Sequence, residues 1–304
     1  MIESAQALTS TELPLKLFHR GKVRDTYELD AERLLMISTD RLSAYDHVLP
    51  NGIPDRGKVL TQLSIWWFGQ THQFQENHLV SGMVPDLPAE VQDHRDELNG
   101  RFMIVRRAER IDIECVVRGY ISGSGWAEYQ EHGTLAGEKL RGGLRESDKL
   151  EEPRFTPATK NDDGHDENIS YDGCIQAVGE PLARRLRDAS LELYRFGAEL
   201  AESRGVILAD TKFEFGLIGD RLILIDEVFT PDSSRYWDAA RYQPGGAPPS
   251  YDKQFVRDWL NGSGWDRDSP PPALPPDIVE QTRERYLTAY ELITGRPLFQ
   301  KEGR

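Results

Sequence analysis

Three charged side chains alternate along one short segment of the chain, at Asp210, Lys212 and Glu214. Because successive side chains of a strand point to opposite faces, an extended backbone would place all three charges on one face. Carboxylates ligate magnesium through oxygen, and a lysine ammonium binds phosphate as a point charge. The segment therefore indicates a site for Mg²⁺ and phosphate, although a solvated strand face with a lysine beside its counter-ions has the same pattern.

A further carboxylate, Asp226, ends the next apolar run, and a turn signal at Gly219-Asp220 separates the two runs. Whether Asp226 meets Glu214 depends on the loop, because a slip of one residue in register moves a side chain to the other face. A two-residue loop sets Ile225 opposite Glu214, whereas a three-residue loop sets Asp226 there. We predict the three-residue loop, or a bulge with the same effect, and hence a shared carboxylate site.

A basic segment surrounds a single glycine near the start of the chain. Residues 19–24 read His-Arg-Gly-Lys-Val-Arg, with Gly21 among the cationic side chains. A glycine-containing hairpin can lie over nucleotide phosphates, where backbone N–H groups and a lysine make the contacts. The segment matches neither the Walker A pattern nor G-x-G-x-x-G, so a surface basic turn is an equally good interpretation of it alone.

Two groups of hydroxyl and guanidinium side chains complete the set. One is Ser233-Ser234-Arg235, and the other is Arg118 with Ser122 and Ser124. Arginine binds phosphate or carboxylate through parallel hydrogen bonds, and hydroxyls add further donors. Either group alone has the composition of an ordinary turn with an ion pair, but two such groups flanking an acidic hairpin indicate an anion site.

The remaining composition argues against several other classes of protein. Lys and Arg total 37 against 51 Asp and Glu, so the formal net charge is −14 and a general nucleic-acid surface is disfavoured. Two cysteines cannot form the disulfide framework of a small secreted domain, and no apolar run is long enough to span a bilayer. We therefore expect a cytoplasmic protein with small-molecule ligands, and neither nucleic acid nor a membrane as a partner.

Other catalytic designs lack support in the sequence. The histidines do not have zinc-site spacing, and no G-x-S-x-G nucleophile elbow occurs. Cys115 alternates with Ile111 and Ile113, which predicts a buried structural thiol rather than a nucleophile.

The charged segments need elements that hold them in place. Period-two patterns predict a strand, turn and strand across 15–37, a strand within 102–118, and a hairpin of 206–209 with 222–225. Helical spacing predicts helices at 58–70, 181–204 and 277–294, with Gly205 and Gly295 as end signals of the last two. The polar stretch 135–168 reads as a loop, either an excursion over a site or a mobile connection. A length of 304 residues favours two packed lobes, which we divide at 1–110 and 111–304, with the proline-rich tail wrapping the second lobe.

Together the motifs resemble the SAICAR synthetase family, in its longer, single-function form. The resemblance covers most of the chain, and the last two of its five motifs are highly specific in succession. The motifs are Gly21-Lys22-Val23-Arg24-Asp25, the segment 38–46 (Ser-Thr-Asp-Arg-Leu-Ser-Ala-Tyr-Asp), the segment 114–120 (Glu-Cys-Val-Val-Arg-Gly-Tyr), the segment 210–216 and the segment 226–237.

The resemblance implies an α+β fold with two lobes, an N-terminal antiparallel sheet lobe and a C-terminal lobe related to ATP-grasp enzymes. It also implies a carbon–nitrogen ligase of purine biosynthesis that uses ATP and Mg²⁺. Such an enzyme joins L-aspartate to the carboxylate of carboxyaminoimidazole ribonucleotide (CAIR) through an acyl phosphate, with ADP and phosphate as by-products.

Site residues are carried over by matching motif positions. The resemblance assigns the nucleotide to Gly21, Lys22, Val23, Arg24, Lys160 and Lys212, and Mg²⁺ to Glu214 and Asp226. It assigns CAIR or aspartate to Ser43, Asp46, Glu114, Arg118, Ser124, Ser234 and Arg235. Catalysis is assigned to Lys212, Asp210 and Arg235.

Two other functions use the same residues. A small-molecule kinase would need the same Mg-ATP site, and a stable phosphorylated product formed without aspartate would identify it. A nucleotide-sensing module would bind without turnover, although intact acids at both metal positions argue against it. We expect a monomer or a small homo-oligomer.

Overall fold

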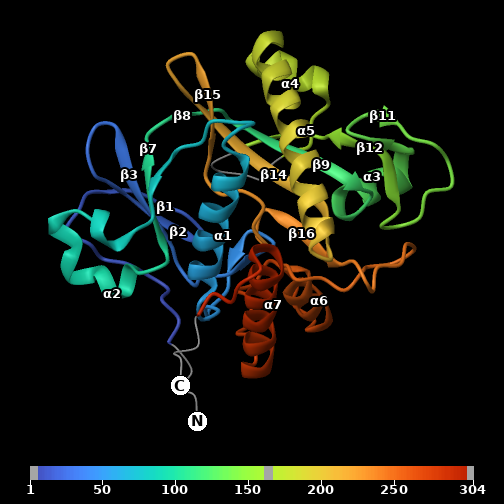
Figure 1. Cartoon of the computed structure of the whole chain (residues 1–304). Helices are drawn as coiled ribbons and strands as arrows, with labels where there is room; N and C mark the ends of the chain where they lie inside the picture. Colours follow the sequence, from blue (N-terminus) through green and yellow to red (C-terminus); the bar gives the residue numbers. More distant parts are fainter. Residues whose placement is uncertain (1–5, 161–166, 300–304) are drawn as a thin grey trace. The chain divides into compact units, whose positions relative to one another are not determined.

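The structure, a computed structural model, describes residues 6–160 and 167–299, which form two compact units. Within these ranges the first unit contains residues 6–69, 78–107 and 251–299, and the second contains 70–77 and 108–250. Figure 1 shows helices and antiparallel sheets in both parts of the chain, so the fold is α+β. Nowhere in the described ranges does a helix combine the length and hydropathy that crossing a membrane requires.

The first unit is built on a five-stranded antiparallel sheet. Its strands, in spatial order, are β1 (Leu17–Arg20), β2 (Arg24–Glu28), β3 (Arg33–Ser38), β7 (Phe102–Arg106) and β6 (Leu79–Ser81). Alternation along β3 and β7 buries Leu35, Ile37, Phe102 and Ile104 in one cluster. The short helices η2 (Ala89–His94) and α2 (Arg95–Leu98) supply Val91 and Leu98 to the same core, and Leu87, which follows η1 (Val84–Asp86), joins them. The strand, turn and strand predicted across 15–37 are confirmed.

The C-terminal helices complete a second core of this first unit. Helices α6 (Gln254–Gly262) and α7 (Pro276–Thr294) contribute Val256, Leu260 and Ile278, which pack with Leu42 and Ile53. Between β3 and β6 the chain forms the hairpin of β4 (Ser43–Ala44) and β5 (His47–Val48) and then helix α1 (Arg56–Thr71). The predicted division at residue 110 placed this tail with the second lobe, whereas the compact units place it with the first. Periodicity gives a helix an apolar face, but it does not identify the surface that the face covers.

The second unit is organised around one long strand. Strand β14 (Val206–Ile218) pairs with β9 (Ile113–Tyr120) and β16 (Ser234–Asp238) over its first part, and with β15 (Arg221–Ile225) and β8 (Glu109–Arg110) near its end. The stretch 135–168, read as a loop, instead contains paired strands. These are β10 (Thr134–Leu135) with β11 (Glu138–Lys139), and β12 (Lys149–Phe155) and β13 (Ala158–Thr159), which extend the sheet through β9.

Three helices in the described part of the second unit accompany its sheet. Helix α5 (Glu180–Ser203) packs on β14 and confirms the helix predicted at 181–204 (Figure 1). Gly197 allows close packing there, because a Cβ at this position would meet the Phe229 ring at 2.4 Å. Helix α4 (Tyr171–Val178) precedes α5, and α3 (Gly123–His132) follows β9 directly.

Candidate active site

Two arginines meet one buried carboxylate at the centre of the second sheet. Asp210 on β14 lies opposite Arg118 of β9 on one side and Arg235 of β16 on the other. The Nη1 of Arg118 donates to Asp210 Oδ2 at 3.1 Å, and Nη1 of Arg235 donates to the same oxygen. Burial is the largest influence on the pKa of Arg118 and, with Arg235, lowers it despite Asp210. Two guanidiniums therefore share one carboxylate oxygen, and Glu128 also acts on Arg118.

The first turn of α3 faces the same arginines. Arg118 Nη2 donates to Ser124 Oγ at 3.0 Å, and Ser122 stands at the N-cap with its hydroxyl 3.5 Å from Asp210. At Gly123, φ is 55°, and a Cβ there would lie 2.2 Å from the Arg235 guanidinium. Unpaired N–H groups at a helix N-terminus bind anions, so this turn and the two arginines together suit an anion such as phosphate.

Three residues predicted for CAIR or aspartate, Arg118, Ser124 and Arg235, lie together around Asp210, which was predicted for catalysis. Ser234 was predicted to assist them, but its hydroxyl bonds the Thr211 hydroxyl at 2.8 Å and is buried. Strand alternation explains this result, because Ser234 and Thr211 face away from their neighbours Arg235 and Asp210.

A second cluster of lysines and carboxylates lies further along the same strands. Lys212 Nζ lies 2.5 Å from Glu114 Oε1 and 3.7 Å from Glu214 Oε1, and Lys160 Nζ also pairs with Glu214. Burial by itself would lower the pKa of Lys212, but Glu214, Glu114 and Asp226 together raise it above its ordinary value. Lys212 is therefore a cation held among acids, and the alternation predicted for this segment is confirmed.

The hairpin that carries Asp226 does not have the predicted register. Ile218 pairs with Arg221 and Glu214 pairs with Ile225, so the loop contains two residues, Gly219 and Asp220, and the three-residue prediction is wrong. Gly219 has φ 59° and occupies the first position of this loop, which suits a tight type II′ turn. Asp226 follows β15 with φ 66°, a left-handed conformation that redirects the chain after the strand. Its charge reaches Lys212 by this turn rather than by strand pairing.

The oxygen donors in this cluster suit magnesium. Glu214 and Asp226 provide two carboxylates, and both act on Lys212. Within 6–160 and 167–299, no group of three or more His, Cys, Asp or Glu side chains has an arrangement that would hold a metal ion. Mg²⁺ characteristically uses one or two carboxylates and takes its other ligands from water and substrate phosphates. The residues present therefore fit that mode of binding and not a closed protein cage.

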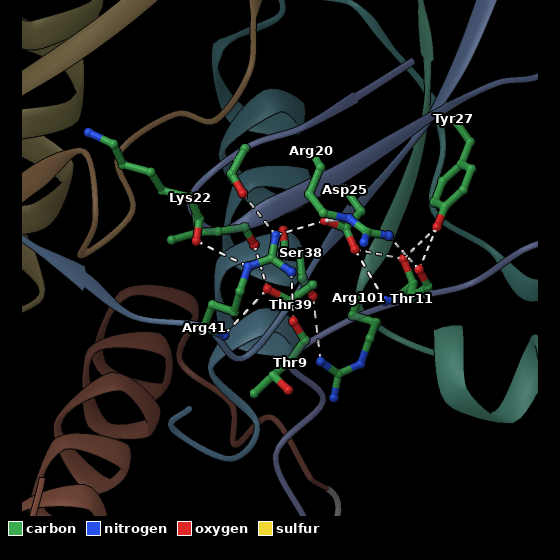
Figure 2. Close-up of polar contacts among 12 residues, drawn as sticks. Thr9, Thr11, Arg20, Lys22, Asp25, Tyr27, Ser38, Thr39, Arg41 and Arg101 are labelled. Carbon is green, nitrogen blue, oxygen red and sulfur yellow. Dashed lines mark hydrogen bonds and ion pairs between the residues drawn. The ribbon is translucent and has the colours of Figure 1, made fainter. Parts of the chain in front are cut away.

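In the first unit, a buried aspartate anchors the glycine-containing segment. Figure 2 shows Asp25 surrounded by Thr11, Arg20 and Arg41. The carboxylate has no solvent exposure and accepts from Thr11 Oγ1 at 2.8 Å and from Arg41 Nη2 at 2.7 Å. Sequence reasoning missed Arg41 and Asp25 as site residues, although both stand in the quoted motifs, because their role depends on contacts between distant segments.

The hairpin β4–β5 presents a second predicted group in the first unit. Its two turn residues, Tyr45 and Asp46, have φ 50° and 65°, the left-handed values of a type I′ turn that usually carries Asn or Gly. The Lys22 ammonium pairs with the Asp46 carboxylate, so these two predicted residues meet. Ser43 lies in β4 at the start of this turn. Strain retained at such a position is typical of a functional site.

The fold and these clusters define a class of protein: an α+β protein with a cationic anion site and an acidic, lysine-rich site on one sheet, suited to phosphorylated ligands and a divalent cation. The family model described as SAICAR synthetase matches residues 17–272. The chain belongs to the SAICAR synthetase family.

Similar proteins extend over nearly the whole chain. Phosphoribosylaminoimidazole-succinocarboxamide synthase of Desulforapulum autotrophicum is 52% identical, over 96% of this chain and 99% of its own length. The protein of the same name from Geobacter metallireducens is 50% identical over 96% of this chain and 99% of its own length. Among solved structures, SAICAR synthase from Saccharomyces cerevisiae complexed with SAICAR has a TM-score of 0.88 and 44% identity, covering 95% of this chain and 99% of that one.

Proposed function

We propose that the chain is an ATP-dependent ligase that condenses L-aspartate with CAIR to give SAICAR, ADP and phosphate in purine biosynthesis. The relatives that match nearly its full length carry the name of this activity. The observation that carries the proposal is the pair of clusters on one strand face, with an anion site at Asp210 and a carboxylate–lysine site at Glu214. The first cluster suits the 5′-phosphate of the ribonucleotide, and the second suits the phosphoryl transfer to its carboxylate.

The spacing of these clusters follows from strand geometry. Asp210 and Glu214 are four residues apart on β14, so their backbone positions are separated by about 13 Å. Arg118, Arg235 and the α3 N-terminus hold the 5′-phosphate of the ribonucleotide at one end. Its carboxylate then extends toward Lys212 and Glu214, where phosphoryl transfer takes place.

The chemistry requires activation of a carboxylate, which is a poor acyl donor. A carboxylate oxygen of CAIR attacks the γ-phosphorus of ATP, the bond to the β-phosphate oxygen breaks, and ADP leaves. The aspartate amine then attacks the acyl carbon, loses a proton and expels inorganic phosphate. Positioning and neutralisation of negative charge account for most of the catalysis in such transfers. Lys212 and Lys160 supply that neutralisation.

The contacts of Asp210 favour a positioning role over the catalytic role that the resemblance assigned to it. Its carboxylate oxygen is engaged by both arginines and lies in the buried part of the sheet. We therefore assign it to positioning Arg118 and Arg235, which contact the substrate. Mg²⁺, held by Glu214 and Asp226 together with ATP oxygens, would supply Lewis-acid stabilisation of the phosphate charge.

Labelled oxygen tests the proposal directly. Purified protein is supplied with ATP, Mg²⁺, L-aspartate and CAIR carrying ¹⁸O in its carboxylate, and products are resolved by mass spectrometry. SAICAR and ADP should form in equal amounts, with one ¹⁸O atom in the released phosphate. A stable phosphorylated product formed without aspartate would instead establish a kinase.

The setting of the enzyme follows from its substrates. ATP and phosphorylated ribonucleotides are metabolites of the cytoplasm, where we place the protein. The monomer or small homo-oligomer expected from the sequence stays a prediction, which sedimentation velocity measures.

A further inference from the structure

Arg41 contacts the backbone of the basic glycine segment at two successive carbonyls. Its Nη2 donates to Gly21 O at 3.0 Å and its Nε to Lys22 O at 3.1 Å (Figure 2). Nη1 donates to Thr9 O at 2.7 Å, and Nη2 also pairs with Asp25 at 2.7 Å. The Arg41 side chain is only 11% exposed, and partners on three segments hold its guanidinium in place.

The next carbonyl points the same way. Val23 O accepts from Thr39 N at 3.0 Å and from Thr39 Oγ1 at 2.8 Å. Three consecutive carbonyl oxygens, those of Gly21, Lys22 and Val23, are therefore directed at residues 39–41. A carbonyl oxygen facing a phosphate would repel it, so this arrangement removes three unfavourable dipoles from the other side of the segment.

The amide groups are left for another partner. Among the described residues, the backbone nitrogens of Lys22 and Val23 donate no hydrogen bond, whereas Gly21 N closes a turn onto Arg24 O at 2.8 Å. Successive N–H groups whose carbonyls point away form an anion-binding concavity. The half-exposed Lys22 side chain, which pairs with Asp46, adds a positive charge to the same segment.

Neither the backbone nor the packing of the first unit requires a glycine at position 21. The φ of Gly21 lies outside the left-handed region, and a Cβ there would meet its nearest atoms at 3.5 Å, an ordinary contact. Neither backbone conformation nor packing excludes alanine at this position. A glycine in such a place suits the close approach of a ligand to the backbone.

We propose that Arg41 is a positioning residue for residues 21–24: it turns their carbonyls inward so that the N–H groups of Lys22 and Val23 bind the phosphates of a nucleotide. The inference rests on the proposed function, which supplies ATP as that nucleotide. Arg41 itself contacts no substrate, and its effect passes through the backbone of Gly21 and Lys22.

Arg41→Lys and Arg20→Lys form a matched pair for the test. Both arginines pair with Asp25, but Arg20 makes its other bond to Thr11 O and contacts no carbonyl of residues 21–24. A lysine keeps the charge and cannot hold two carbonyls in a fixed fork. We expect Arg41→Lys to raise the Kd for ADP and the KM for ATP about ten- to a hundredfold, with kcat at saturating ATP and the KM for CAIR little changed. Arg20→Lys should bind nucleotide like the wild type.

Isothermal titration with ADP and steady-state kinetics decide the outcome. Wild-type protein that binds neither ADP nor ATP would overturn the proposed function and the inference with it. Nucleotide binding that is normal in the wild type and unchanged in Arg41→Lys would overturn the inference alone, as would an equal loss in Arg20→Lys. Gly21→Ala provides an independent variant if Arg41→Lys fails to fold: it should melt like the wild type yet bind ADP about tenfold more weakly. Unchanged ADP binding by Gly21→Ala would also overturn the inference.

Discussion

Glu214 is paired with two lysines. Lys160 and Lys212 both reach its carboxylate, which the sequence resemblance assigned to Mg²⁺. A lysine ammonium placed here occupies the position that a cation and its phosphate ligands would share. Metal and nucleotide binding would therefore release Lys160 from Glu214 and make its charge available to phosphate.

Lys160→Met tests this exchange at a single residue. Removing the ammonium should lower kcat/KM for ATP about tenfold or more, because a charged contact to phosphate is lost. It should also tighten Mg²⁺ binding to the nucleotide-free protein, because a competitor for Glu214 is gone. Titration with MgCl₂ and steady-state kinetics measure both effects, with the exposed Lys139→Met as control. Kinetics and Mg²⁺ affinity identical to the wild type would contradict this role.

At the residue scale, the sequence predicted which charged side chains share a strand face, but it did not predict their partners on distant segments. Alternation was enough to bring Lys212 beside Glu214, and the structure confirms it. Arg41 escaped notice because its bonds join Thr9, Gly21 and Asp25, which are separated by up to 32 positions from it. Such contacts depend on tertiary structure, which no local spacing records.

At the element scale, helix α3 begins at Gly123 and is capped by Gly133, and these two glycines allow a matched comparison. Gly123 and Gly133 both have left-handed φ, 55° and 70°. A Cβ at Gly123 would collide with the Arg235 guanidinium, whereas nothing lies within 4 Å of one at Gly133. The two positions therefore share backbone strain and differ in contact with the anion site.

Gly123→Ala and Gly133→Ala should separate strain from binding. Each should lower the free energy of unfolding by about 1 kcal/mol or more, because alanine is disfavoured in this conformation. Only Gly123→Ala should raise the KM for CAIR, by about tenfold or more, since it displaces Arg235. Urea denaturation and kinetics measure the two quantities. An unchanged KM for CAIR in Gly123→Ala would place the ribonucleotide phosphate elsewhere.

Helix α4 carries a thiol whose titration reports its packing. Burial raises the pKa of Cys174 from 9.0 to about 11. A folded pKa above the unfolded value means that the neutral thiol stabilises the fold fully below about pH 9 and that this contribution is lost as the pH rises toward 11. Stability should therefore fall more in the wild type than in Cys174→Val between pH 8 and pH 10.5, measured by urea denaturation at each pH. Equal losses in the two proteins would show that the thiol is not desolvated.

Elements were predictable where one period was sustained. Helix α5 and strands β2 and β3 have clear periods, and all three were anticipated. Strand β12 was read as loop because its side chains are mostly polar and exposed, so hydropathy carries no signal for it. The predicted register of β14 and β15 was wrong because the length of a turn cannot be decided from a Gly-Asp signal alone.

At the scale of the whole molecule, the C-terminal tail belongs to the core of the first unit. Val256 and Leu260 of α6 are buried against Leu42 and Ile53, more than 200 positions away. The resemblance predicted the α+β class correctly, and the near-full-length similarity of the relatives agrees with it. The partner of the tail was not predictable, because an apolar helix face suits any apolar surface.

A chain that ends at residue 250 should therefore lose part of the hydrophobic core of the first unit. Its first unit would expose Leu42 and Ile53, so we expect the shortened chain to aggregate or to unfold without cooperativity. Size-exclusion chromatography and calorimetry measure these two outcomes. Leu260→Ala in the full chain should give a graded version, with about 2–5 kcal/mol less stability. A 1–250 chain that melts cooperatively at the temperature of the full chain would contradict this view of the core.

Strand β14 also limits how the enzyme can diverge. It has hydrogen-bonded neighbours along most of its 13 residues, so its length between Asp210 and Glu214 cannot relax. Deleting one residue would turn one cluster to the opposite face, and deleting two would shorten the interval by about 7 Å. Substrates of intermediate length are thus inaccessible through gradual change in this strand. A change in the length of the ribonucleotide would instead require changes in the loops and helix ends around the strand, where insertions are tolerated.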